Sequence, residues 1–279
     1  MAPLREEFVA APLGKIQVFR GGSGPPLVYL HSAGGEAQGL GLLEDLAEAF
    51  DVWAPIFPGF GESEGIEEID GIDDAVFHLL DLWELFQLDA PSVLGCSLGG
   101  WMALELAVRY PEKVGRMALV NPVGLYLPEA PIAELFGRSP AELADMLFVD
   151  QEHPVAAAMH AMEEFTGDVG KAVEIPIELV LPMWKALGAT ARLGWDPYLH
   201  DPKLRGRLRR ITAPTLVVAG AQDGLVPVAH AETLAAEIPD AELAVIDQAA
   251  HWLIFERPGE LAGLARDFFA GSLGATPGS

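Results

Sequence analysis

The sequence predicts an α/β protein with a mostly parallel central sheet, helices on both faces of that sheet and one inserted helical segment. Short apolar runs, typical of strands buried on both faces, alternate with longer stretches in which apolar residues recur at helical spacing. Turns rich in glycine and proline separate these segments. Such alternation indicates parallel strands joined by helices that pack on the sheet. A chain of 279 residues, 51% of them hydrophobic, can bury a core of this kind.

Each element is predicted by its own local pattern. In residues 27–30 the side chains are apolar or aromatic throughout, which favours a buried strand. In residues 71–86 apolar side chains recur every three or four positions, which favours a helix, and Pro111 ends a later helix. By these criteria strands are expected at 15–20, 27–30, 52–57, 92–96, 116–120, 215–220 and 243–246, and helices at 40–50, 71–86, 99–110, 228–237 and 258–269.

Residues 122–205 interrupt this rhythm. They are rich in Ala, Leu, Met and Glu and show no strand alternation, so we expect a helical cap inserted into a core formed by residues 1–121 and 206–279. Methionine adapts its shape to irregular apolar surfaces, so the cap could line an apolar pocket, or its side chains could pack the cap's own core. The residues concerned are Met146, Met159, Met162, Met183, Phe148, Phe165 and Trp184.

Charge, cysteine content and the N-terminal sequence limit which partners, cofactors and cell compartments are plausible. Seventeen basic and 41 acidic residues give a formal net charge of −24, which disfavours nucleic acid and anionic membrane surfaces. Cys96 is the only cysteine, so an intramolecular disulfide and a cysteine-built zinc site are excluded. The first residues lack the pattern of a signal peptide, and no apolar run approaches the ~18 residues of a membrane span. We expect a cytoplasmic protein that uses no cofactor or metal. Its oligomeric state, monomer or homodimer, is left open.

A candidate nucleophile lies between a predicted strand and a predicted helix. Gly95-Cys96-Ser97-Leu98-Gly99 is a Gly-x-Ser-x-Gly turn in the context that such a turn requires. The glycines permit a tight turn, and Ser97 would stand at the N-terminus of the helix, where the helix dipole favours developing negative charge. Cys96 occupies an x position, so we expect it to be buried filler rather than a nucleophile.

A serine nucleophile needs a base and an acid that orients the base. Asp223 and His251 each follow a predicted strand, in the chain order serine, aspartate, histidine. Open α/β sheets gather ligands at these strand ends. Asp247 competes with Asp223 as the acid, but it lies only four residues from His251 on the same connection. The other histidines are expected to be structural: His31, His78, His153, His160, His200 and His230.

The tetrahedral intermediate of acyl transfer needs two backbone donors for its oxyanion. Leu98 supplies one N–H directly after the nucleophile. Ala33 is best placed for the second, in the loop His31-Ser32-Ala33-Gly34-Gly35 that follows the strand at 27–30. His31 would hold this loop by hydrogen bonds.

From residues 14 to 270 the chain resembles the α/β-hydrolase fold family. The chain departs from the family's pattern at two positions. It has His31-Ser32 where many relatives carry His-Gly, and Ile56 where many carry an aspartate. The resemblance implies the α/β-hydrolase fold and the triad Ser97, His251 and Asp223. The matching motifs are His31-Ser-Ala-Gly-Gly, Pro58-Gly-Phe-Gly-Glu-Ser63, Gly95-Cys-Ser-Leu-Gly-Gly100, Ala213-Pro-Thr-Leu-Val-Val-Ala-Gly-Ala-Gln-Asp223 and His251-Trp252.

Three functions are compatible with this resemblance. The leading expectation is a carboxylesterase that cleaves a small-molecule, mainly apolar ester. The alternative is a hydrolase of carbon–carbon bonds in ring-fission diketones, which Leu119-Val-Asn-Pro-Val-Gly-Leu125 and His251-Trp252 somewhat resemble. Such enzymes use a cap arginine near the substrate carboxylate, and Arg138 and Arg192 are available. A further alternative is a non-catalytic ligand-binding member of the fold.

Overall fold

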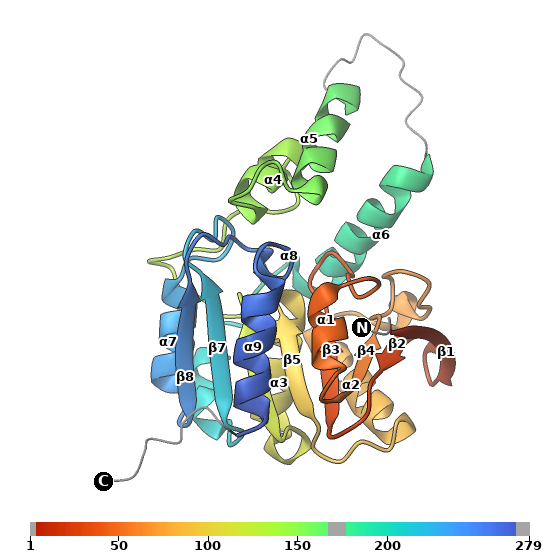
Figure 1. Ribbon diagram of the computed structural model, residues 1–279, viewed down its shortest axis with the longest axis vertical. Coiled ribbons are helices and arrows are strands. Elements are labelled where there is room, and N and C mark those ends of the chain that lie inside the picture. Colours follow the sequence, from red (N-terminus) through yellow and green to blue (C-terminus); the bar gives the residue numbers. More distant parts are fainter. Residues whose placement is uncertain (1–3, 167–176, 272–279) are drawn as a thin grey trace.

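The computed structural model describes residues 4–166 and 177–271. A central sheet forms the middle layer of this part of the chain (Figure 1). Its eight strands follow the order β1-β2-β4-β3-β5-β6-β7-β8. The pairs β1–β2 and β2–β4 are antiparallel, and all the other pairs are parallel. This confirms the mostly parallel sheet. The strands are β1 (Arg5–Ala11), β2 (Gly14–Gly21), β3 (Pro26–Leu30), β4 (Asp51–Pro55), β5 (Ser92–Cys96), β6 (Arg116–Val120), β7 (Thr215–Gly220) and β8 (Ala241–Ile246).

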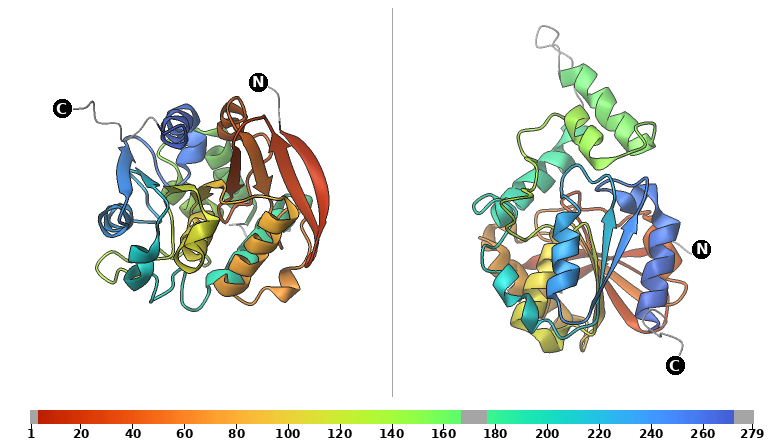
Figure 2. Two further views of the ribbon diagram at one scale, coloured as in Figure 1. Left: turned by 90° about the horizontal axis from the view of Figure 1, so that it is seen from below. Right: turned by 90° about the vertical axis from the view of Figure 1, so that its left-hand side faces the viewer.

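Helices cover both faces of the sheet, as predicted. Figure 2 shows α1 (Gly41–Leu46) and α9 (Pro258–Phe269) on one face, and these two helices contact each other. On the other face lie α2 (Ile72–Leu85), α3 (Leu98–Arg109) and α7 (Ala229–Glu237). The shorter helices are α8 (Leu253–Glu256), η1 (Ile66–Glu68) and η2 (Pro111–Lys113). No helix within the described ranges is long and apolar enough to cross a membrane.

Two elements differ from the expectation. β1 was not predicted, because an edge strand with mostly exposed side chains shows no apolar alternation, and it forms by antiparallel pairing with β2. The helix expected at 40–50 is shorter, since α1 ends at Leu46 and residues 47–50 turn back toward β4.

The long connection from β6 to β7 carries α4 (Pro140–Leu147), α5 (Pro154–Thr166), α6 (Ile177–Gly194) and the 3-10 helix η3 (Arg205–Arg210). A capping box starts α4: the Ser139 hydroxyl accepts the N–H of Glu142, and the Glu142 carboxylate accepts the N–H of Ser139. In Figure 1 the three α-helices lie beyond the ends of β5 and β7. The predicted division into core and cap at residues 121 and 206 stays a prediction.

The turn from β5 to α3 packs closely against the carboxyl end of β3. Ser97 adopts a positive φ of 50°, which is strained for a residue with a side chain. Gly99 packs on the end of β3, so that a Cβ atom there would lie 2.1 Å from the Leu30 carbonyl oxygen. A Cβ at Gly95 would lie 2.6 Å from the Gly99 oxygen. The glycines of the motif are therefore required by backbone contacts.

Replacing Gly99 tests this contact. We expect Gly99→Ala to lower the free energy of unfolding by about 3 kcal/mol or more, because backbone atoms on both sides must move to admit the methyl group. Gly188→Ala is the matched control, since Gly188 lies inside α6 with nothing within 4 Å of the added Cβ. There the change should stabilise by about 1 kcal/mol through helix propensity. Urea unfolding measures both values, and effects of equal sign would contradict the packing argument.

His78 on α2 is buried without a polar partner. Its side chain is 1% exposed, it packs edge-on against Phe57, and neither ring nitrogen has a hydrogen-bond partner among the described residues. Burial disfavours the charged imidazolium and lowers the pKa of His78 to about 4. The unfolded chain takes up this proton near pH ~6.5. Above that pH His78 is neutral in both states and does not affect the free energy of unfolding. As the pH falls from there toward 4, the unfolded chain binds a proton that the folded chain does not, and the free energy of unfolding decreases.

The pH dependence of stability should accordingly change in His78→Leu. Between pH 7 and pH 5 we expect wild type to lose about 2 kcal/mol more unfolding free energy than this variant, since each unit of pKa shift corresponds to about 1.4 kcal/mol. Phe77→Leu, at an exposed neighbouring position that carries no proton, is the control and should parallel wild type. Parallel curves for wild type and His78→Leu would show that His78 is not the acid-sensitive group.

Candidate active site

Ser97 meets His251 at the carboxyl end of the sheet. The Ser97 side chain follows β5 directly and is 5% exposed. Its hydroxyl lies 2.9 Å from Nε2 of His251, within hydrogen-bond distance. The N-terminus of α3 begins at the next residue, so the positive end of the helix dipole lies at the hydroxyl.

Asp223 orients His251 from the turn after β7. Nδ1 of His251 lies 2.8 Å from Oδ2 of Asp223, and both side chains are almost completely buried. Oδ1 of Asp223 accepts the N–H groups of Leu225 and Val226, each at 2.8 Å. Because the carboxylate can only accept, Nδ1 carries the hydrogen and Nε2 is left to accept the Ser97 hydroxyl proton. Asp247 is exposed and makes no such contact.

Asn121 fixes the loop that carries His251, and sequence reasoning did not single it out. Its Nδ2 donates to the carbonyls of Ala250 and His251, at 3.1 and 2.8 Å, and its Oδ1 accepts the N–H of Gly220. Asn121 has a φ of 44°, a conformation that asparagine tolerates better than most residues. An asparagine directly after a strand and before a proline was the available signal.

Hydrogen bonds in the loop after β3 leave one amide free. The N–H of Gly34 donates to the Ser32 hydroxyl and the N–H of Gly35 donates to the Ser32 carbonyl, both at 3.1 Å. The N–H of Ser32 donates to Glu36. Among residues 32–35, Ala33 alone has an N–H without a partner in the ranges that the structure describes, and the N–H of Leu98, first in α3, has none there either. These are the two donors predicted for the oxyanion.

His31 holds this loop, as the sequence indicated. Its Nδ1 donates to the Ser32 carbonyl at 2.6 Å, and its Nε2 accepts the N–H of Phe57 at 2.9 Å. Burial lowers the pKa of His31, which agrees with a neutral ring in these two roles.

A cavity of about 450 Å³ opens above Ser97 and His251. Its wall is apolar, with contributions from α4, α5 and α6, and among the described residues it includes no lysine or arginine. Met159 and Met183 line the cavity, as the composition of the insertion suggested. The same expectation for Trp184 is wrong, because this side chain points outward from α6 and is 70% exposed. The side chain of Phe165 lies outside the described residues.

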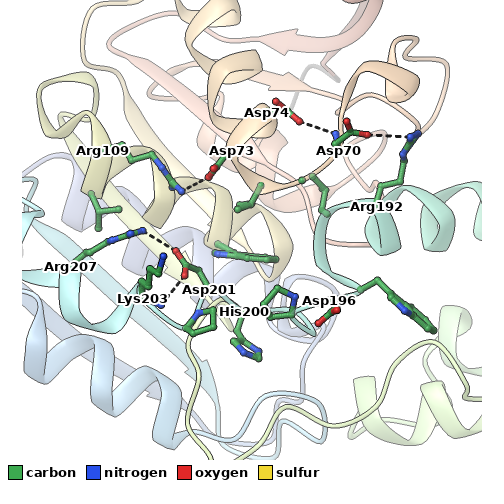
Figure 3. A pocket seen from close by; sticks show the side chains of 18 of the residues that line it. Asp70, Asp73, Asp74, Arg109, Arg192, Asp196, His200, Asp201, Lys203 and Arg207 are labelled. Carbon is green, nitrogen blue, oxygen red and sulfur yellow. Dashed lines mark hydrogen bonds and ion pairs between the residues drawn. The ribbon is translucent and has the colours of Figure 1, made fainter.

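The two arginines considered for a substrate carboxylate lie elsewhere. Arg138 is bonded to Glu142 at the start of α4. Arg192 faces a separate open groove of about 1380 Å³, where it pairs with Asp70 at 3.5 Å (Figure 3). Other charges in this groove are also paired, among them Arg207 with Asp201 and Arg109 with Asp73.

The insertion is bonded to both loops that carry the acid and the base. The carbonyl of Met146 accepts the N–H of Gly224, beside Asp223, at 3.2 Å. The carbonyl of Leu147 accepts the N–H of Trp252, beside His251, at 3.0 Å. Glu256 adds a second link, since its carboxylate accepts N–H groups from Val149, Asp150 and Ala250. The sequence carried no signal for this role of Glu256.

Two histidines between β6 and β7 have other contacts in the described part of the chain. His153 stacks on Phe148, and His160 lies 2.8 Å from the side-chain oxygen of Gln151. Within the described residues no group of three histidine, cysteine or carboxylate side chains is arranged to hold a metal ion.

Comparisons with known proteins identify the fold family and its relatives. Residues 25–258 match the family model described as alpha/beta hydrolase fold. A 2-hydroxy-6-oxo-6-phenylhexa-2,4-dienoate hydrolase from Burkholderia cepacia is 28% identical over 92% of this chain and 91% of its own. A pimeloyl-acyl-carrier-protein methyl ester esterase from Aromatoleum aromaticum is 30% identical over 88% of this chain and 99% of its own. A solved dienoate hydrolase from a Rhodococcus species superposes with a TM-score of 0.76 at 26% identity, covering 97% of this chain and 100% of that one.

The relatives include both kinds of hydrolase that the sequence suggested. Hydroxymuconate semialdehyde hydrolases also match, so the comparisons support the carbon–carbon alternative better than the ester reading. The fold prediction is confirmed. With its strand order, its strand–serine–helix turn and a match over residues 25–258, the chain belongs to the α/β-hydrolase fold family.

Proposed function

We propose that the protein is a serine hydrolase that cleaves carboxylic esters of small-to-medium apolar acids. The observation that carries this proposal is the chain of hydrogen bonds from Asp223 through His251 to Ser97, at the floor of an apolar cavity. In this arrangement His251 accepts the Ser97 proton as the oxygen attacks the substrate carbonyl. The N–H groups of Ala33 and Leu98 receive the oxyanion. An alcohol leaves, and water activated by His251 releases the acid.

The apolar cavity favours an uncharged acyl group. A carboxylate transferred into such surroundings without a partner loses several kcal/mol of hydration. Neither Arg138 nor Arg192 reaches the cavity to compensate. The ester remains the leading candidate for this reason, and residues 122–205 would act as the cap that provides the acyl pocket. The substrate is a small molecule, nucleic acid and membranes are not proposed partners, and the proposed location is the cytoplasm.

The second candidate is hydrolysis of a carbon–carbon bond in a ring-fission diketone. Its support is the similarity to dienoate and semialdehyde hydrolases. The same serine, histidine and oxyanion donors would serve, and the leaving group would be carbon rather than oxygen. A ligand-binding protein without turnover is the remaining alternative, which labelling of Ser97 by a fluorophosphonate would exclude.

The triad is tested by three substitutions. Ser97→Ala should lower turnover of p-nitrophenyl butyrate by about 10⁶-fold, since the nucleophile is lost. Asp223→Asn should lower it roughly 10³–10⁴-fold, because an amide favours the wrong imidazole tautomer. Asp247→Asn is the matched control and should stay near wild type, because Asp247 is exposed and away from His251. Circular dichroism checks folding, and a reversed order of the two aspartate variants would reassign the acid.

A pair of substrates of similar shape tests the charge preference. We expect kcat/KM for p-nitrophenyl butyrate to exceed that for the p-nitrophenyl monoester of succinate by about 100-fold or more, because only the second carries a carboxylate into the cavity. The phenyl-substituted dienoate named in the relatives is assayed beside them. Faster turnover of this dienoate than of the butyrate ester would establish the carbon–carbon reading instead.

Chain length probes the cavity wall in the same assay. Each methylene buried should raise kcat/KM about fourfold until the cavity is full, given about 0.8 kcal/mol per CH₂. Met159→Ala enlarges the cavity and should move the optimum to longer acids, whereas Trp184→Ala at the exposed face of α6 should leave the profile unchanged. If the chain-length profiles of Met159→Ala and wild type superimpose, Met159 does not form part of the acyl pocket.

A further inference from the structure

The carboxylate of Glu36 is bonded within the loop that carries Ala33. Oε1 accepts the Tyr29 hydroxyl at 2.7 Å and the N–H of Ser32 at 2.9 Å. Oε2 accepts the Ser32 hydroxyl at 2.7 Å. The same oxygen packs against Gly34, where a Cβ would approach it to 2.9 Å. One side chain thus holds the loop from both of its oxygens.

These bonds determine which amide of the loop stays free. With its hydrogen donated to Glu36, the Ser32 hydroxyl oxygen is oriented to accept the N–H of Gly34 at 3.1 Å. The N–H of Gly35 is taken by the Ser32 carbonyl. Among residues 32–35, only the N–H of Ala33 has no partner within the described part of the chain. The Ser32 hydroxyl therefore links Glu36 to Gly34 through two hydrogen bonds.

The network also reaches the nucleophile. Tyr29 lies in β3, beside β5, and its register partner Leu94 is three residues before Ser97. Burial raises the pKa of Tyr29, so its hydroxyl keeps the hydrogen that it donates to Glu36. Glu36 is thus bonded both to the loop that carries Ala33 and to the strand that pairs with β5.

We infer that Glu36 is a positioning residue of the oxyanion hole, which acts by holding Ser32 and Gly34 so that the N–H of Ala33 stays directed at the reacting carbonyl. This inference rests on the proposed function of Ser97. Glu36 is not among the described residues that line the cavity above Ser97. Its removal should affect the transition state, in which the oxyanion is charged, more than the binding of the neutral ester.

Two variants of Glu36 grade the effect. Glu36→Ala removes both acceptor oxygens and the three hydrogen bonds that they accept. We expect kcat on p-nitrophenyl butyrate to fall about 30–100-fold with KM within about twofold, since loss of one oxyanion donor lowers turnover by about 10²–10³-fold. Glu36→Gln keeps the oxygen that serves Tyr29 and the Ser32 N–H, so activity should return to within about fivefold of wild type. Glu48→Ala, at an exposed glutamate, is the control and should equal wild type.

A pair of ketones separates positioning from general loss of structure. Heptyl trifluoromethyl ketone adds to a serine hydroxyl and places an oxyanion in the hole, whereas heptyl methyl ketone binds without reacting. Glu36→Ala should weaken inhibition by the fluorinated ketone by the same 30–100-fold as kcat, about the factor expected for a disturbed oxyanion donor, and should leave the methyl ketone within about twofold. Tyr29→Phe and Ser32→Ala, which each remove one hydroxyl, should fall between Glu36→Gln and Glu36→Ala.

The outcomes separate the inference from the proposed function. If Ser97→Ala abolishes activity but Glu36→Ala binds the fluorinated ketone as Glu48→Ala does, the inference is wrong and the proposed function stands. Equal weakening of both ketones would also overturn the inference, because it would indicate a structural role. If wild type neither binds the fluorinated ketone more tightly than the methyl ketone nor depends on Ser97, the proposed function fails, and the role of Glu36 fails with it.

Discussion

The approach of Gly99 to the Leu30 carbonyl is the contact on which the rest of the site depends. A side chain at this position would overlap the end of β3, so the turn after β5 can lie against the loop after β3 only because glycine stands there. That contact places Ser97 beside the loop that carries Ala33. Backbone packing thus brings the nucleophile and the N–H of Leu98 next to this loop, within which the side chains of Ser32 and Glu36 form further hydrogen bonds. The strained φ of Ser97 is held by the same packing.

Much of the fold and of the site could be predicted because the relevant signals are local. Buried parallel strands are apolar throughout, and the strand–serine–helix turn needs glycine at fixed positions, so residues 92–99 were interpretable from sequence alone. Strand ends also led to Asp223 and His251, and the structure places His251 within hydrogen-bond distance of both Asp223 and Ser97. Their catalytic roles stay proposals until they are measured.

The features that were missed depend on contacts between distant segments. β1 forms by pairing with β2 at the edge of the sheet. Trp184 points outward, although its large apolar side chain would suit a pocket wall as well as that of Met183 does. Helical periodicity shows that a helix has two faces but does not say which one meets the cavity. Asn121 and Glu256 form hydrogen bonds with backbone groups that lie more than 90 residues away in the sequence. No local sequence pattern therefore predicts these contacts. Glu36 lies close in sequence to its partners, but its hydrogen bonds follow from the path of the loop.

The bonds from residues 146–150 to Gly224, Trp252 and Glu256 have a consequence for exchanging parts between relatives. The end of α4 belongs to the framework that holds the acid and the base, although it lies in the inserted segment. A chimera that replaces the whole insertion would also replace these supports, so it would disturb turnover together with substrate range. An exchange confined to α5 and α6, which line the cavity but are absent from these bonds, would alter the substrate range and leave the supports intact. Laboratory evolution of this protein therefore has a natural unit smaller than the whole segment between β6 and β7.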